Sequence, residues 1–110
     1  IADQRFESYL SNVDFIQRYI FPGGFLPSIS LMNDKLKNQT DMVMEELHDI
    51  GLDYAKTLAD WRTLFNASWH ELKEHGFDDK FKRLWLYYFA YCEGAFLERA
   101  ISTVHLVARK

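Results

Sequence analysis

This sequence has little cysteine and only a small net charge. Cys92 is the single cysteine, so the chain cannot form an internal disulfide, and we expect a reducing compartment, the cytoplasm. The formal net charge of −3 gives no reason to expect nucleic acid as a partner. No apolar run approaches the roughly 20 residues that span a bilayer. With 110 residues, the chain has room for one domain at most.

Signatures of metal and phosphate sites are missing as well. The four histidines show no metal spacing, since His70 and His75 are five apart on one predicted helix and do not share a face. Gly23 and Gly24 lie between two prolines and lack the G-x-G-x-x-G spacing. No histidine is placed to activate Cys92 as a nucleophile. The residues alone therefore predict no metal site and no complete active site.

Apolar and aromatic residues, in contrast, are abundant. Hydrophobic residues make up 48% of the chain and aromatic residues 16%, which exceeds what a few helices can bury. The excess favours either a channel for an apolar ligand or a surface that packs against more protein.

The N-terminal third is predicted to be helical with one apolar loop. Apolar spacing from Arg5 to about Ile20 predicts one helix, or two shorter helices with a break near Ser11 and Asn12. The loop FPGGFLPS follows, because its prolines and glycines stop any helix. Ser28 is a candidate N-cap for a short helix that ends in the polar patch Lys37 to Thr40.

Two strands and two long helices are predicted for the rest. Residues 41–48 are compatible with a helix, but we favour a strand because Gly51 and a predicted N-cap at Asp53 require an earlier element to end there. A helix then runs from Tyr54 to about His75, with Gly76 after its end. Asp78 or Asp79 caps a second helix to about residue 100, and residues 101–108 have strand composition. The two strands are predicted to pair antiparallel, which gives an α+β chain.

Two polar side chains, those of Tyr54 and Glu93, are candidate site residues. Tyr54 lies at the predicted strand-to-helix corner, where its ring either packs under the turn or points into a cleft. Glu93 lies inside an aromatic helix, so its carboxylate either pairs with Arg99 or Arg62 or faces a wet cavity. Pairing is the favoured interpretation.

Three blocks in order, RYIFPGGFLPS, HDIGLDYAKTLADW and FDDKFKRLWLYYFAYCEGAFLERAI, cover nearly the whole chain. Together they resemble the C-terminal part of cyclopropane-fatty-acid synthases, S-adenosylmethionine-dependent methyltransferases related to the mycolic acid cyclopropane synthases. The resemblance implies that residues 1–110 form the C-terminal part of a seven-stranded, Rossmann-like methyltransferase domain, with helices over the substrate channel. Residues 41–51 and 101–110 would be its last two strands.

The same resemblance implies the chemistry. The full-length enzyme would add a methylene to the cis double bond of a phospholipid acyl chain, using S-adenosylmethionine, and a bound bicarbonate would remove the proton so that the ring closes. The cofactor-binding residues lie upstream in the family, so we expect this chain to be an inactive fragment that binds no cofactor alone.

Four residues match functional positions of the family. Tyr54 matches the tyrosine that helps to hold bicarbonate, which suits a phenol because it donates a hydrogen bond to an anion. Tyr88, Cys92 and Phe21 match positions that line the lipid channel. Glu93 differs from the residue in some relatives and receives no role.

The implied partners are unsaturated phospholipid acyl chains at the membrane surface, through peripheral contact, and the N-terminal half of the same domain. Self-association is expected from unpaired strand edges. Two other interpretations stay open: a non-catalytic lipid-binding module, and an interaction domain with an exposed apolar face.

Overall fold

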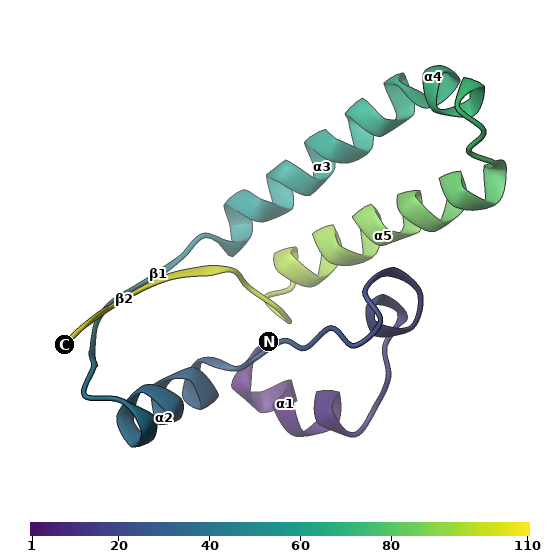
Figure 1. Cartoon of the computed structure of the whole chain (residues 1–110). Coiled ribbons are helices and arrows are strands. Elements are labelled where there is room, and N and C mark those ends of the chain that lie inside the picture. Colours follow the sequence, from purple (N-terminus) through teal and green to yellow (C-terminus); the bar gives the residue numbers. More distant parts are fainter.

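The computed structural model describes all of residues 1–110 and is elongated. Its radius of gyration of 17.1 Å exceeds the roughly 13 Å of a compact domain of this length. Figure 1 shows α3 and α5 side by side as a helical hairpin, with α4 at its tip and the strands at its base. In chain order the elements are α1 (Asp3–Leu10), the π-helical turn η1 (Ile16–Ile20), α2 (Ile29–Gln39), β1 (Val43–Asp49), α3 (Gly51–Ala67), α4 (Trp69–Glu74), α5 (Asp79–Leu97) and β2 (Val104–Arg109).

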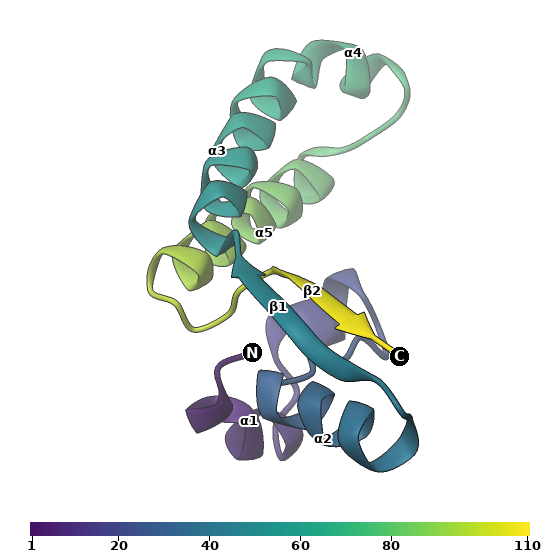
Figure 2. The ribbon, with the colours of Figure 1, turned by 90° about the vertical axis from the view of Figure 1, so that its left-hand side faces the viewer.

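The two strands pair antiparallel, as predicted. His48 lies opposite His105 in the register, and a bulge separates Met44 from Glu46. Helix α2 packs against β1, and Figure 2 shows it beneath the two-stranded ribbon. The predicted strands and the α+β class are therefore confirmed.

The hydrophobic core lies between α3 and α5. Leu58 is fully buried at its centre, and neither strand contributes a buried residue. The buried apolar side chains are Ala55, Leu58, Phe89, Cys92 and Phe96. Ser28, which precedes α2, is the only buried polar residue. The chain thus has one packed region, the hairpin, and one open region around the strands.

Local capping signals in the sequence are confirmed at two helices. Ser28 Oγ accepts a hydrogen bond from the Leu31 amide at 3.2 Å, which caps α2. Asp78, rather than Asp79, caps α5 by accepting from the Phe81 amide at 2.8 Å. Each bond satisfies an amide that the first helical turn leaves unpaired.

Residues 5–20 form two short elements, the second of the two predicted alternatives. Helix α1 ends at Leu10, and a new turn begins after Asp14. The Asp14 carboxylate accepts from the Gln17 amide at 2.8 Å, and the Gln17 side chain accepts from the Asp14 amide at 3.1 Å. This reciprocal pattern is a capping box, which fixes where the second element starts.

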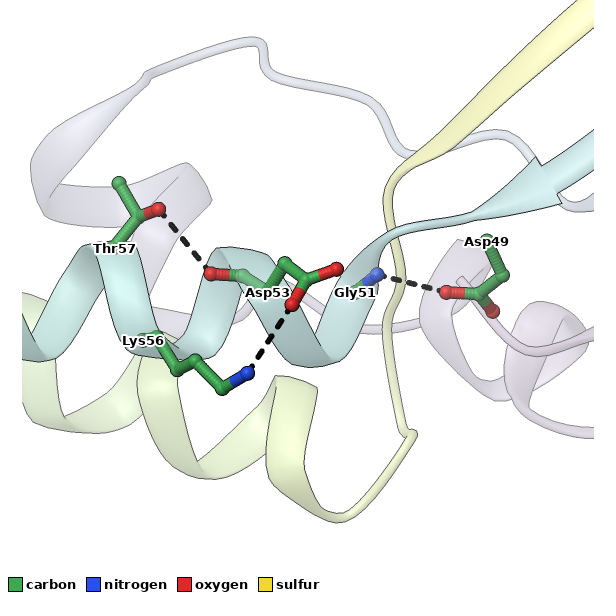
Figure 3. A network of polar contacts seen from close by, with 5 residues as sticks. All are labelled: Asp49, Gly51, Asp53, Lys56 and Thr57. Carbon is green, nitrogen blue, oxygen red and sulfur yellow. Dashed lines mark hydrogen bonds and ion pairs between the residues drawn. The ribbon is translucent and has the colours of Figure 1, made fainter.

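The predicted N-cap at Asp53 is wrong. Helix α3 begins at Gly51, three residues before its predicted start, and the Gly51 amide donates to the Asp49 carboxylate at 2.8 Å (Figure 3). The Ser102 hydroxyl also donates to Asp49. Asp53 lies in the first turn and forms an exposed ion pair with Lys56 at 3.3 Å. Asp49 therefore ties the end of β1 both to α3 and to the segment that follows α5.

Gly51 serves close approach rather than an unusual backbone conformation. It is buried, and a Cβ at this position would collide with the Ser102 hydroxyl. The positive φ values among glycines occur at Gly23 and Gly76 instead. At Gly76, which follows α4, the conformation ends the helix as predicted.

The predicted continuous helix from Tyr54 to His75 is also wrong. Ser68 separates α3 from α4. Just before the break, the Asn66 side chain donates to the Arg62 carbonyl at 3.1 Å, a local bond of the kind that competes with regular helix. Helix α5 ends at Leu97, slightly before its predicted end.

Candidate functional site

The four predicted site residues come from three segments. Phe21 follows η1, Tyr54 lies in the first turn of α3, and Tyr88 and Cys92 lie one turn apart on α5. The Phe21 and Tyr88 rings meet edge-on, with centroids 6.1 Å apart. Burial raises the pKa of Tyr88, and the nearby Cys92 and Tyr54 groups raise it further. The structure therefore brings the four side chains into one region; their roles remain predictions.

Tyr54 is held in place by its neighbours. Its amide donates to the Ile50 carbonyl at 2.9 Å, and its half-buried ring packs against Phe96 and Trp61 with centroids 5.1 and 5.9 Å apart. Aromatic contacts of this kind contribute roughly 0.5–1.5 kcal/mol each beyond area burial. The ring direction is thus fixed by packing, so the hydroxyl is presented in a defined place.

The Tyr54 and Tyr88 hydroxyls differ from the hydroxyl of Tyr9. The Tyr9 hydroxyl is used within the fold, since it donates to the Gly24 carbonyl at 3.4 Å and accepts from the Leu26 amide at 2.9 Å. Neither of the other two makes a hydrogen bond within the chain. A phenol is both a donor and an acceptor, so both hydroxyls remain able to bind a ligand.

The Cys92 thiol is in its neutral form near neutral pH. Burial, with a smaller contribution from Asp14, raises its pKa to about 11. Because the thiolate is the nucleophile, this environment argues against nucleophilic catalysis and favours Cys92 as a small apolar wall. Together with Tyr91 and Ile16, it lines a cavity of about 340 Å³ between α1 and α5; Phe21, Tyr54 and Tyr88 do not line this cavity.

Glu93 forms a cross-helix ion pair. Its carboxylate lies 2.8 Å from Nη2 of Arg62, one of the two partners predicted for it. The bond joins α5 to α3 beside the core. Since the carboxylate is paired, Glu93 has a structural role in the hairpin and is a weak candidate for a catalytic base.

The chain offers no metal centre and no open glycine-rich loop. No group of three or more His, Cys, Asp and Glu side chains gathers where it could hold a metal ion. In the Gly23–Gly24 turn, the Gly24 amide already donates to the Phe21 carbonyl at 2.8 Å, so the loop uses this amide internally. None of the helices has the length and hydropathy needed to cross a membrane.

Several contributors to the site were not predicted. Trp61 and Phe96 hold the Tyr54 ring, and their signal was present: Trp61 is seven residues from Tyr54, on the same helix face. Asp14, which lies in a loop, helps to raise the pKa of Cys92, and no spacing rule relates those two positions.

Comparisons with known proteins agree on one family. A family model described as "Mycolic acid cyclopropane synthetase" matches residues 2–106. The cyclopropane-fatty-acyl-phospholipid synthase of Escherichia coli (strain K12) is 39% identical over 97 residues, which cover 87% of this chain and 25% of that protein. The tuberculostearic acid methyltransferase UfaA1 of Mycobacterium tuberculosis is 39% identical over 82 residues, 74% of this chain and 19% of that protein. A probable fatty acid methyltransferase of Pseudomonas putida is 30% identical over 97 residues, 88% of this chain and 24% of that protein. The chain therefore spans a quarter or less of the length of these relatives.

Proposed function

Because this chain belongs to the mycolic acid cyclopropane synthetase family, we propose that it supplies the acyl-channel part of an S-adenosylmethionine-dependent lipid methyltransferase. The reaction adds a methylene to the cis double bond of a phospholipid acyl chain. Residues 1–110 would be the C-terminal part of a Rossmann-like methyltransferase domain. The observation that carries this proposal is the environment of Tyr88, which meets Phe21 edge-on and has Tyr54 and Cys92 nearby, so that three separate segments contribute to it.

In this proposal the α5 side chains and Phe21 hold the acyl chain. The rings of Phe21 and Tyr88 would offer the chain an apolar surface, and the neutral thiol of Cys92 lies one turn along α5 from Tyr88. Aromatic faces also stabilise a nearby cation by roughly 0.5 to 2 kcal/mol each, which suits a reaction that develops positive charge on the acyl chain.

Tyr54 is the proposed contact for bicarbonate. Its ring is fixed by Phe96 and Trp61, and its hydroxyl makes no bond within the chain, so the phenol fits the role of a donor to a bound anion. Bicarbonate, when bound, supplies the base for the reaction.

S-adenosylmethionine does not fit this chain by itself. The one pair of adjacent glycines is closed by its own hydrogen bond, and no glycine-rich strand-to-helix loop is present. We therefore assign cofactor binding to other parts of the enzyme and propose that the isolated chain is inactive. We further propose a cytoplasmic enzyme in peripheral contact with the membrane.

The direct test is Tyr54→Phe in the whole enzyme that contains this chain. Loss of one preorganised donor to an anion is expected to lower turnover by about 100-fold or more. Tyr19→Phe is the matched control, because Tyr19 is 57% exposed and packs on Phe15 away from Tyr54. Full turnover in the Tyr54→Phe enzyme would refute the bicarbonate role.

A second candidate, a non-catalytic lipid-binding or interaction module, is favoured by the extent of exposed apolar surface. Large side chains such as Val43, Leu64 and Phe21 are more than half exposed. Binding of a fatty acid by the isolated chain, with loss on Tyr88→Ala, would support the lipid-binding version. Concentration-dependent self-association would support the interaction version.

A further inference from the structure

The junction between β1 and α3 lies about one helical turn before Tyr54. Its central atom is Oδ1 of Asp49, which accepts hydrogen bonds from the Gly51 amide at 2.8 Å (Figure 3) and from the Ser102 hydroxyl. These bonds, that of Ser102 first, lower the pKa of Asp49, so its carboxylate is ionised and a strong acceptor near neutral pH. One oxygen atom thus joins the start of α3 to the segment that follows α5.

The two segments are packed closely at this junction. A Cβ at the buried Gly51 would collide with the Ser102 hydroxyl, so the backbones approach each other as far as a glycine allows. The Ile50 amide also donates to the Thr103 carbonyl at 3.0 Å. The junction therefore fixes how far the first turn of α3 lies from the end of α5.

Tyr54 depends on this distance because its ring is held from both helices. Trp61 shares α3 with Tyr54 and moves with it, whereas Phe96 belongs to α5, and its ring centroid lies 5.1 Å from that of Tyr54. The next side-chain hydrogen bond between the two helices, from Arg62 to Glu93, lies about 12 Å further along α3. The junction is therefore the nearest polar tie that keeps Tyr54 against the α5 ring.

We propose that Asp49 is a positioning residue for Tyr54 and that, through Oδ1, it keeps the Tyr54 hydroxyl where an anion can accept its hydrogen bond. This role of Asp49 rests on the proposed function, since the anion is the bicarbonate assigned to Tyr54. A misplacement of about 1 Å can lower a rate about 100-fold, so loss of the junction bonds is expected to reduce turnover although Asp49 acts only through Tyr54.

Turnover of the whole enzyme that contains this chain, measured over a series of bicarbonate concentrations, tests this role. Asp49→Ala removes both bonds and is expected to lower turnover at limiting bicarbonate about tenfold. Asp49→Asn keeps a carbonyl oxygen that can accept both bonds, so turnover is expected to stay within about twofold of the unchanged enzyme.

Asp53→Ala is the matched control for loss of a carboxylate at the same end of α3. The Asp53 side chain is 75% exposed and pairs only with Lys56, so its removal is expected to leave turnover unchanged. Equal losses in Asp49→Asn and Asp49→Ala, or a loss of the same size in Asp53→Ala, would overturn the proposal.

A double-mutant cycle separates positioning from a general loss of stability. In a Tyr54→Phe enzyme the hydroxyl is already absent, so adding Asp49→Ala is expected to cost less than about twofold. Ser102→Ala, a milder variant that removes one of the two bonds, is expected to cost about threefold alone and nothing further in the Tyr54→Phe enzyme. Equal losses with and without the Tyr54 hydroxyl, or no loss in either case, would overturn the role of Asp49. Full turnover of Tyr54→Phe by itself would instead refute the bicarbonate role, and with it this one, so the two failures are distinguishable.

Discussion

The α3–α5 hairpin and the β1–β2 ribbon bury their apolar side chains to very different extents. Every buried apolar side chain belongs to the hairpin. On the ribbon, Val43 is 68% exposed, Leu47 44% and Val107 46%. A two-stranded sheet has little stability of its own in water, whereas helices with a shared core support each other. The hairpin is therefore the self-supporting part of the chain, whereas the exposed apolar side chains of the ribbon favour packing against more protein.

The candidate site lies mostly on the self-supporting side. Tyr54, Tyr88 and Cys92 stand on α3 and α5, and Phe21 alone comes from the open region. The positions of these three residues therefore depend on hairpin packing, while the position of Phe21 depends on a loop.

The largest expected effect is on the hairpin core. Leu58→Ala removes a fully buried side chain, and we expect it to lower the free energy of unfolding of the hairpin by about 3 kcal/mol. Leu64→Ala on the same helix, where the side chain is 63% exposed, is expected to change it by less than about 0.5 kcal/mol. Urea unfolding followed by circular dichroism measures both. Similar losses in the two variants would show that Leu58 is not packed in a hairpin core.

The reactivity of Cys92 tests whether the hairpin core is closed. With its pKa raised to about 11, little thiolate exists near pH 8, so alkylation by iodoacetamide is expected to be about 100-fold slower than for the same chain in denaturant. The rate is expected to climb as the pH rises toward about 11, because the thiolate fraction grows. Mass spectrometry of the alkylated chain gives both rates. Equal rates in native and denatured chain would mean that the core is open.

The smallest effects compare the two helix caps. Ser28→Ala and Asp78→Ala each remove one N-cap, at an expected cost of about 1 kcal/mol. Asp78→Ala is expected to lower the protection of amides from hydrogen exchange throughout the hairpin. Ser28→Ala is expected to lower it in α2 alone, because the hairpin does not depend on α2. Hydrogen exchange resolves the two regions. Loss of protection in α3 after Ser28→Ala would show that the regions unfold as one.

Features governed by neighbours in sequence were predictable. Ser28 and Asp78 each bond an amide three residues on, and Gly76 ends a helix through its own backbone; Ser28 and Gly76 were correctly placed, and Asp78 was one of the two caps left open. Asp53 was misplaced because α3 begins earlier, at Gly51, whose amide bonds to Asp49, and Asp49 is in turn bonded by Ser102, which is 53 residues away in sequence. No local rule reports a contact of that range.

The site was predictable to a smaller degree. Helical spacing places Tyr88 and Cys92 on one face of a helix, but their proximity to Tyr54 depends on how α3 and α5 pack. The contact of Phe21 with Tyr88 depends on the path of a loop, which spacing does not determine. For those two relations the family resemblance supplied what the residues alone did not.

The junction at the base of the hairpin separates the length of the hairpin from the pairing of the strands. The Ile50 amide donates to the Thr103 carbonyl at 3.0 Å, and Asp49 is bonded by Ser102, so the excursion from α3 to α5 leaves and re-enters the sheet at one point. Because the ends of this segment already meet, changing its length adds little closure entropy and does not shift the strand register. Residues 51–101 are therefore expected to tolerate changes in length while β1 and β2 keep their pairing.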